Sequence, residues 1–460
     1  MKKVVAIILV IFCLINQGLT NEIKLCDFDY EDEIIKRISN GPIIYIDLRE
    51  CLLLALLNSS YLKAAFAYFE KSKYNLKYAY SELLPNFGFN GYIQDIQGQL
   101  LVGGALIEDL NEVALYGGVY ITHDLTRRGQ VIFNILSKKN LKRAQGYTYK
   151  GTYNDLLREV AISYYELIEA KLTLHNLLTS LCERKYQYEI ANARYEVGEG
   201  DKFDKIRCEI EINETEIEIQ NAIIEFKAKQ AKLARYMGVE ITSNLMPVEV
   251  DLKLYELVDS YDINETYNNA LNYFPKIKEL EANIASLKNQ RNQYFSDFIP
   301  NLSIDAHYSY QGTARQGVLP NFNLMFKVDI PIGDRLGVGT WAKIRAMDKE
   351  IEAKEYELKY QKSLIKENIT VSFIKSKKIL DRIKIYKKEI DLTEKSTNIA
   401  TGRFLEGEGE LIDVIQAQAI KTQTTIGYSV SKAHYNITQI DALYYSGLIS
   451  IENILKNYAP

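Results

Sequence analysis

The chain repeats itself, and this duplication restricts the possible folds more than any other feature of the sequence. The stretch RYEVGEGDKFDKI at 194–206 aligns without a gap to RFLEGEGELIDVI at 403–415, an offset of 209 residues. A second pair of stretches, 55–86 and 270–301, matches at an offset of 215 residues. Because the two matches occur in the same order and at nearly equal offsets, they indicate a duplicated unit of roughly 210 residues.

Each copy of the unit begins with a helical pattern that stops at a proline. Proline cannot continue the interior of a helix, so Pro85 and Pro300 mark helix-to-strand junctions. After each junction, apolar and polar residues alternate, as in strands with one apolar and one polar face. We expect strands at 86–96 and 115–125 joined by a loop at 97–114, and strands at 301–311 and 321–332 in the second copy.

Long helical patterns follow each pair of strands, and a Gly-Glu-Gly turn interrupts each of them. At 1.5 Å per residue, a helix of about 60 residues is about 90 Å long. Such helices are too long for a compact domain. The expected helices are about 130–194 and 335–402 before the turns at 198–200 and 407–409, and about 201–236 and 410–456 after them.

The N-terminus is typical of a secretory signal peptide. Lys2 and Lys3 precede an apolar run at 4–15, and we expect cleavage after Thr20. No later segment has the roughly 20 apolar residues that a membrane-spanning helix needs. The formal net charge of −4 gives no electrostatic reason to expect nucleic acid as a partner. The expected segments are the signal peptide 1–20, an N-terminal segment 21–44, the first repeat 45–236, a linker 237–262, the second repeat 263–456 and a tail 457–460.

Residues suited to catalysis are scattered along the chain. The 4 histidines lie in different segments, and no HExxH, GxSxG or paired cysteine–histidine signature occurs. Cys26, Cys51, Cys182 and Cys208 remain after signal cleavage, show no CxxC spacing and are expected to be isolated thiols. We therefore expect no enzymatic activity, no metal site and no cofactor.

The alternating strands carry aromatic side chains and are short enough to cross an outer membrane. Four strands cannot close a membrane barrel, for which about eight is the lower limit. Three copies would close a 12-stranded barrel in which every backbone group is paired. We therefore predict an α+β membrane protein, a tandem-repeat protomer whose trimer forms this barrel, with the helices continuing as a long α-helical barrel. A soluble β-sandwich on a helical stalk is the alternative, and it leaves the signal peptide and the duplication unexplained.

The order helix, Pro-Asn, two strands, helix, turn, helix resembles the TolC family of outer-membrane efflux and secretion channels. The segment RFLEGEGELIDVIQAQ at 403–418 is similar to the family's recurrent R-[YF]-x-x-G-x-x-x-x-x-D-V-L-x-A-[QR] signature, and the resemblance covers about 45–456. It implies a homotrimer in the outer membrane of a Gram-negative-type bacterium, in contact with outer-membrane lipid and extending into the periplasm. It also implies a periplasmic membrane-fusion adaptor protein and an inner-membrane pump of the RND or ABC type as partners.

Two functions remain open on these grounds. One is the passive outer-membrane channel of a tripartite efflux pump or of a type I secretion system, which the resemblance implies. The other is a structural or adhesive cell-surface protein built on the same long helices. The sequence does not name an exported substrate.

The glycines of the two turns fit a reversal of the chain. Gly198 and Gly407 suit a residue that ends a helix with positive φ, and Gly200 and Gly409 let the chain enter the next helix. The resemblance implies that both turns contact the adaptor. A phosphate-binding loop is the rival interpretation, but no Gly-Lys-Ser/Thr follows and no strand precedes. The acidic residues of the turns, which pair with the adaptor or keep the tip soluble, are Glu199, Asp201, Glu408 and Glu410.

Asp413 matches the family position at which one aspartate per protomer forms a ring that narrows the periplasmic entrance. Three carboxylates around an axis repel one another and attract cations, so the resemblance implies a role in gating and cation selectivity. A solvated carboxylate in the first turn of a helix is the alternative, and it is favoured for the aligned Asp204. Gln416 stands one turn after Asp413, where some members have a second acid. The candidate constriction residues are therefore Asp413, Gln416 and Asp204.

Overall fold

A computed structural model describes residues 30–38, 42–102, 105–198, 200–242, 244–248, 252–255, 262–313, 317–331 and 333–456. The predicted signal peptide 1–20, the tail 457–460, parts of the segments 21–44 and 237–262, and Glu199 lie outside these residues. The chain forms two compact units, which are described separately. Unit 1 comprises Met1–Ser60, Tyr153–Asn269 and Glu367–Pro460, and unit 2 comprises Tyr61–Thr152 and Ala270–Lys366.

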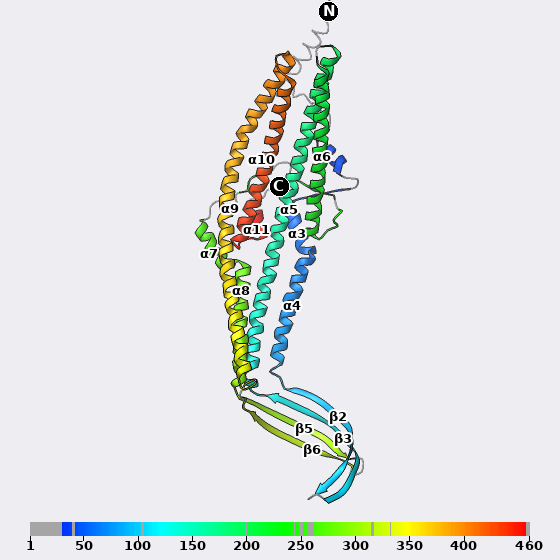
Figure 1. Cartoon of the computed structure of the whole chain (residues 1–460), viewed down its shortest axis with the longest axis vertical. Helices are drawn as coiled ribbons and strands as arrows, with labels where there is room; N and C mark the ends of the chain where they lie inside the picture. Colours follow the sequence, from blue (N-terminus) through cyan, green and yellow to red (C-terminus); the bar gives the residue numbers. More distant parts are fainter. Residues whose placement is uncertain are drawn as a thin grey trace, which may run out of the picture. The chain divides into compact units, whose positions relative to one another are not determined.

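Unit 2 contains a four-stranded antiparallel sheet with the strand order β2-β3-β5-β6 (Figure 1). Pro85 stands between helix α4 and β2, and Pro300 stands between the short helix η2 and β5. Each proline is followed by an asparagine that begins the strand. The elements are α4 Ser60–Ser81, β2 Asn86–Val102, β3 Ala105–Asp124, η1 Arg127–Gly129, α8 Pro275–Phe295, η2 Ser296–Phe298, β5 Asn301–Thr313 and β6 Gly317–Asp329.

The expected loop at 97–114 is wrong, because β2 and β3 continue through it. Their pairing runs to Val102 opposite Ala105, with a shift of register after Leu100. The sequence between them, at 103–104, is Gly-Gly, and such a pair between two strand-like runs is a hairpin signal. The shift of register interrupts the alternation of apolar and polar residues along the strand, and for this reason the sequence pattern predicts a loop.

The last strand also differs from the expected range 321–332. β6 begins at Gly317 and ends at Asp329, so it includes Pro320, which pairs with Tyr310 of β5. β6 is an edge strand, and proline is tolerated in edge strands because they leave one row of backbone groups unpaired.

Unit 1 contains the ends of two long helices and the two helices that follow the turns. Helix α5 covers Gln130–Glu196 and α9 covers Val338–Glu406, close to the expected ranges, and both pass from unit 2 into unit 1. Hairpin 1 is formed by α5 and α6, and hairpin 2 by α9 and α10. The other elements are α2 Tyr30–Ile38, β1 Ile43–Ile46, α3 Leu48–Asn58, α6 Lys202–Met237, β4 Asn244–Pro247, α7 Ile263–Tyr273, α10 Leu411–Tyr445 and α11 Ile451–Leu455.

The linker at 237–262 contributes structure that the sequence did not predict. Its strand β4 pairs in parallel with β1, from Ile43 opposite Asn244 to Ile46 opposite Pro247. The side chains of unit 1 that are almost completely buried include Tyr164, Tyr435 and Phe226. These three side chains lie on α5, α10 and α6, respectively.

The cysteines of unit 1 differ from the expectation at one described position. Cys51 and Cys208 are free and buried, whereas Cys182 takes part in a disulfide, so the expectation of isolated thiols is wrong for Cys182.

Among the described residues, no single helix is long and apolar enough to cross a membrane. In the described part of the chain, the pair α3 and α4, with a 45° bend between them, is together long and apolar enough to do so.

Candidate functional site

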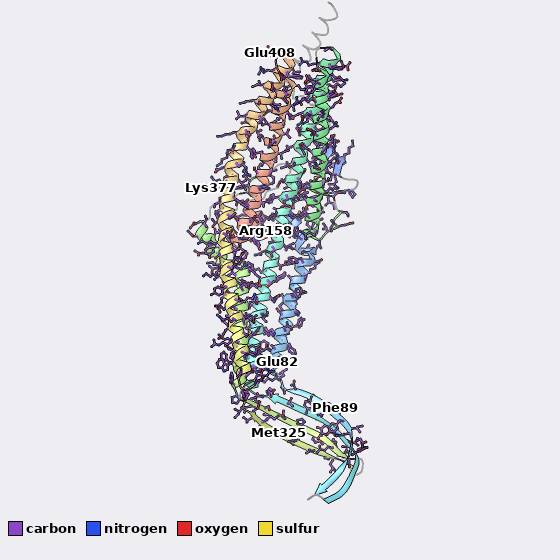
Figure 2. The ribbon with its side chains drawn as sticks, in the orientation of Figure 1. Glu82, Phe89, Arg158, Met325, Lys377 and Glu408 are labelled. Atoms are coloured by element: carbon purple, nitrogen blue, oxygen red, sulfur yellow. The ribbon has the colours of Figure 1, made fainter. Side chains whose placement is uncertain are left out.

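One face of the sheet in unit 2 is apolar from edge to edge. Directly opposed residues in antiparallel strands share a face. The row Phe89, Val119, Tyr308 and Phe322 crosses all four strands and is apolar at every position. Its side chains are exposed, Phe89 at 76% and Phe322 at 66% (Figure 2 labels Phe89). A contiguous exposed apolar surface of this kind marks a contact with an apolar partner or a membrane.

The opposite face of the sheet is polar and better covered. The row Gly88, Tyr120, His307 and Asn323 lies on this face. The Tyr120 ring stacks on the His307 ring with centroids 5.8 Å apart and also lies over Gly88, where an added Cβ would be 2.4 Å from it. Ser309, on the same face, is only 4% exposed. The sheet is therefore inverted relative to a water-soluble protein, with its apolar side outward.

The sheet ends in two edge strands. Within the described residues, β2 pairs only with β3, and β6 pairs only with β5. Each edge strand therefore presents a row of backbone donors and acceptors that another strand can pair with.

The two turns of unit 1 are built alike. Gly198 has φ +81° and Gly407 has φ +77°, a left-handed conformation that glycine adopts without steric cost. The amide of Gly200 donates to the carbonyl of Arg194 at 3.0 Å, and the amide of Gly409 donates to that of Arg403 at 3.0 Å. The matched sequences thus close matched turns.

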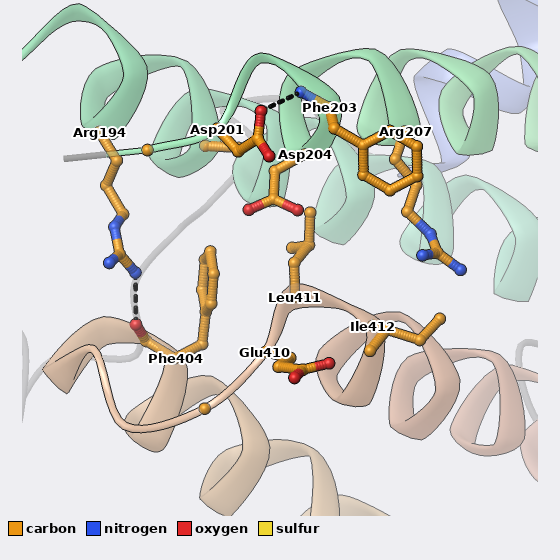
Figure 3. A pocket seen from close by; sticks show the side chains of 12 residues that line it. Arg194, Asp201, Phe203, Asp204, Arg207, Phe404, Glu410, Leu411 and Ile412 are labelled. Carbon is orange, nitrogen blue, oxygen red and sulfur yellow. Dashed lines mark hydrogen bonds between the residues drawn. The ribbon is translucent and has the colours of Figure 1, made fainter. Parts of the chain in front are cut away.

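A single arginine joins the two turns. Arg194 Nη1 donates to the carbonyl oxygen of Phe404 at 2.6 Å, and the guanidinium carbon lies 4.8 Å from the centre of the Phe404 ring. Both groups line a cavity of about 420 Å³ between the turns (Figure 3). Below it, a buried cluster contains Phe404, Cys208, Leu411, Val414 and Ile415. The link and the cluster hold hairpin 1 against hairpin 2.

Asp204 lines this cavity. Partial burial raises the pKa of the Asp204 carboxyl, and the nearby Asp201 and Glu410 raise it further, while Arg194 and Arg207 oppose the rise. The carboxylates of Asp201, Asp204 and Glu410 therefore share one small space between the turns. Deprotonation of Asp204 adds charge repulsion to this space.

Asp413 and Gln416 lie elsewhere, although Asp413 aligns with Asp204 in the repeat. Both are exposed on α10 and line an open groove of about 620 Å³ between α9 and α10, together with Arg403 and Lys395. The equivalent carboxylates thus have different surroundings. One is enclosed by hairpin 2, and the other faces open space.

The remaining acidic residues of the turns have separate roles. The side chain of Asp201 caps α6 by accepting a hydrogen bond from the amide of Phe203 at 3.0 Å. Glu410 precedes α10 without a side-chain cap bond, and Glu408 is exposed at the end of hairpin 2 (Figure 2). Glu199 lies outside the described residues.

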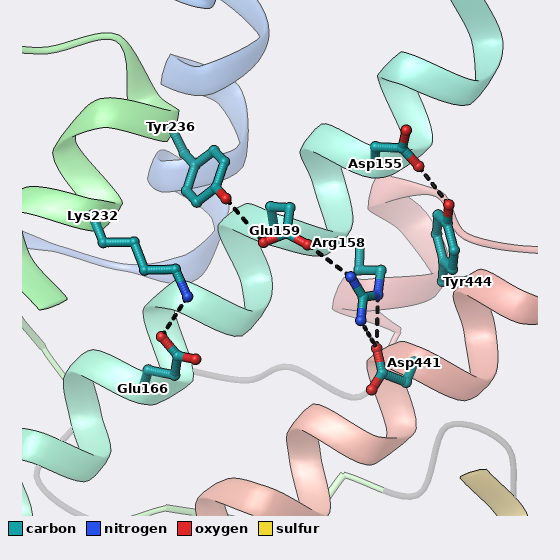
Figure 4. A network of polar contacts seen from close by, with 8 residues as sticks. All are labelled: Asp155, Arg158, Glu159, Glu166, Lys232, Tyr236, Asp441 and Tyr444. Atoms are coloured by element: carbon teal, nitrogen blue, oxygen red, sulfur yellow. Dashed lines mark hydrogen bonds and ion pairs between the residues drawn. The ribbon is translucent and has the colours of Figure 1, made fainter. Parts of the chain in front are cut away.

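A polar network joins α5 to its neighbours and was not foreseen from the sequence (Figure 4). Arg158 Nε donates to Asp441 at 2.7 Å, and the hydroxyl of Tyr444 donates to Asp155 at 2.5 Å. Burial raises the pKa of Asp155 and of Asp441, and Arg158 opposes both rises. No local pattern predicts these contacts, because their partners lie on helices that are far apart in the sequence.

Within the described residues, no group of three or more His, Cys, Asp or Glu side chains could hold a metal ion. No protein-family model and no curated protein sequence matches the chain.

Solved structures match almost the whole chain. The outer-membrane channel OprN aligns with a TM-score of 0.79 at 16% identity, over 88% of this chain and 90% of that one. The CmeC outer membrane channel of Campylobacter jejuni gives 0.78 at 16% identity, over 89% and 88%. The outer membrane protein VceC of Vibrio cholerae gives 0.75 at 14% identity, over 87% and 96%.

The chain has the fold of the outer-membrane channels. The resemblance to the TolC family is confirmed at the level of the fold, as is the tandem order of helices and strands within it. OprN and CmeC are outer-membrane channels.

Proposed function

We propose that the protein is a passive export channel of the outer membrane. The observation that carries this proposal is the inverted sheet, whose apolar face is exposed and whose polar face is buried or half-buried on the central strands, as at Ser309 and His307. Strands of membrane barrels alternate in this way, with apolar residues toward lipid and polar residues toward the lumen. Placed in a membrane, the row through Phe89 and Phe322 would contact outer-membrane lipid, and the row through His307 would line the conduit.

The free edges support assembly into a closed barrel. An edge strand exposed to lipid would leave backbone groups without hydrogen bonds, at a cost of several kcal/mol each. Pairing β6 of one copy with β2 of the next removes every such edge. Three copies then supply the 12 strands that the resemblance implies, and the helices of the homotrimer continue into the periplasm.

The turns of unit 1 would form the periplasmic end. Asp413, exposed in an open groove, is the candidate for a ring of three carboxylates at a constriction, with Gln416 one turn further. Asp204 is enclosed between the turns and is a weaker candidate for that ring. The turn residues proposed to contact a membrane-fusion adaptor are Gly198, Glu199, Gly200, Asp201, Gly407, Glu408, Gly409 and Glu410.

The proposed channel would serve an inner-membrane pump, in a tripartite efflux system or in type I secretion. Both uses need the same conduit and the same tip. The inner-membrane pump would select the substrate, and the sheet and the turns of this chain specify neither the class of the pump nor its substrate.

Reconstitution in planar bilayers tests the proposal. We expect a conductance that prefers cations. Because Asp413→Ala would remove a ring of carboxylates, we expect this variant to have a higher conductance or a weaker block by multivalent cations. Glu218→Gln, which removes an exposed carboxylate of α6, is the matched control. No conductance at any voltage or pH would refute the channel, in favour of a structural surface protein. If Asp413→Ala changes neither the conductance nor the block by multivalent cations, the constriction alone is refuted.

A further inference from the structure

The junction segment between β6 and α9, Gly333–Gly337, has a strained backbone. Arg335 has φ +51° and Leu336 has φ +61°, and no other two neighbouring non-glycine residues in the described part of the chain have positive φ. A residue with a side chain enters this left-handed region at a cost in free energy, and usually as a single residue. Such strain persists only where the surrounding contacts impose it, and it is concentrated in functional segments.

Hydrogen bonds impose this conformation on the junction segment. The carbonyl oxygen of Asp334 accepts from the amide of Gly337 at 3.1 Å and from the amide of Gly339 at 3.2 Å. The amide of Asp334 donates to Thr340 Oγ1 at 3.1 Å, and that hydroxyl donates to Asp297 Oδ2 at 3.3 Å. Thr340 is completely buried. The left-handed residues are therefore a defined part of unit 2.

This conformation leaves an apolar side chain outside the protein. Leu336 is 84% exposed, the highest fraction of any large apolar side chain in the described residues, and Val338 at the start of α9 is 72% exposed. Removing such side chains from water is favourable, whereas here the backbone is strained and the leucine stays exposed. The arrangement therefore indicates a contact with an apolar partner outside this chain.

The junction segment continues the apolar face of the sheet. Phe326 of β6 is 72% exposed, and Ile330, directly after β6, is 73% exposed (Figure 1 shows β6 leading into α9). Trp341, the only tryptophan of the sequence, is 52% exposed near the start of α9, and its ring centroid lies 5.9 Å from that of Phe295. Tryptophan is enriched where a membrane meets water, because its ring is apolar and its N–H is polar.

Arg335 adds an available positive charge. It is exposed and forms no ion pair or hydrogen bond with the described residues, whereas the adjacent Asp334 pairs with Lys343 at 3.2 Å. Arg127, at the corresponding junction between β3 and α5, also has positive φ, but it pairs with Asp124 at 3.5 Å. A guanidinium group binds phosphate oxygens through two parallel hydrogen bonds. The charge of Arg335 thus suits an anion outside the chain.

We propose that the junction segment binds a phospholipid, with Leu336 in the acyl-chain region and the Arg335 guanidinium on the phosphate. A phospholipid joins an apolar chain to an anion, as the segment joins Leu336 to Arg335. This inference rests on the proposed function, which places the sheet in a membrane, and it identifies a lipid-binding segment at the end of the sheet from which the helices continue.

The fluorescence of Trp341 tests the position of the segment, because the sequence has no other tryptophan. The full chain is reconstituted in phosphatidylcholine vesicles that carry bromine either near the headgroup or near the end of the acyl chain. We expect bromine near the headgroup to quench at least about twofold more, since indole rings settle at the interface. The control is Trp341→Phe/Tyr356→Trp, which moves the tryptophan about four turns along α9 to an exposed position and should prevent quenching.

Competition between two lipids tests the role of Arg335. We expect brominated phosphatidylglycerol, which is anionic, to bind beside Trp341 roughly fivefold more tightly than brominated phosphatidylcholine, as for one basic side chain at a membrane surface. Arg335→Asn should abolish this preference without disturbing the backbone, because asparagine tolerates the left-handed conformation. Lys359→Gln, which removes an exposed charge further along α9, should keep it. A preference that survives in Arg335→Asn would overturn the proposal.

A third tryptophan position separates the junction segment from the channel. In Trp341→Phe/Phe326→Trp, the tryptophan lies on the apolar face of β6 and should be quenched by brominated lipid if the sheet is in the membrane. Quenching at this position with normal conductance, but none at Trp341, would refute the lipid contact alone and place the segment in water or against a second copy. Quenching at Trp341 without conductance supports the lipid contact and refutes the channel. No quenching at either position and no conductance refute both.

Discussion

Replacing Arg194 by methionine tests whether one side chain keeps the two turns together. A hydrogen bond from a charged group contributes roughly 1.5–3 kcal/mol, and a cation–π contact at a partly exposed site about 0.5–1 kcal/mol. Arg194 makes both contacts with Phe404 and is half-buried, so the lower values apply, about 2 kcal/mol together. Methionine keeps an apolar stem, so the loss is confined to the charged head.

The buried thiol of Cys208 reports the separation of the turns. It belongs to the cluster that Phe404 and Leu411 cover, and burial raises its pKa to about 11. Labelling therefore requires the turns to open, and its rate follows the open population when reclosing is fast. A loss of about 2 kcal/mol should accelerate labelling roughly 30-fold. Cys51, the other free buried thiol among the described residues, lies on α3 and should keep its rate.

Arg207→Met is the matched variant, because Arg207 lines the same cavity without a hydrogen bond to hairpin 2 among the described residues. An unchanged rate for Cys208 in Arg194→Met, or an equal acceleration in Arg207→Met, would show that the link does not hold the turns. Acceleration of both thiols would indicate general loosening of unit 1 instead.

Three further predictions concern other parts of the chain. Gly407→Val forces a β-branched residue to φ +77°, so we expect a loss of about 1–2 kcal/mol at the turn, and reduced export with trimers intact on native gels. The pKa of the Asp204 carboxyl is raised in the folded state above its ordinary value of 3.8. The protonated carboxyl therefore contributes stability below pH 3.8, and this contribution is lost as the pH rises through the folded-state pKa. Asp204→Asn should raise Tm at pH 7 in calorimetry but not below pH 3.8. Phe326→Arg places a charge on the apolar face and should weaken insertion into liposomes by about 2–4 kcal/mol, measured in urea titrations. Asn323→Arg on the polar face should leave insertion unchanged. Equal effects of the two variants would contradict the assignment of faces.

The order of elements could be predicted from the sequence because it depends on local signals. Proline ends a helix whatever surrounds it, as at Pro85 and Pro300. Glycine adopts a left-handed conformation that other residues disfavour, as at Gly198 and Gly407. Helices α5, α6 and α9 therefore begin and end within a few residues of their expected positions. The expected helix at 410–456 is wrong at its end, because α10 stops at Tyr445 and a separate short helix, α11, covers Ile451–Leu455. The strands within 97–114 do not follow from the two-residue period, because the register of β2 and β3 shifts after Leu100.

The surroundings of the candidate site could not be predicted in the same way. Asp204 and Asp413 have the same place in the repeat, and nothing local distinguishes an enclosed carboxylate from an exposed one. The difference arises because hairpin 2 follows hairpin 1 in one chain and covers it. The partner of Arg158 is likewise 283 residues away in the sequence, so no spacing rule could identify Asp441.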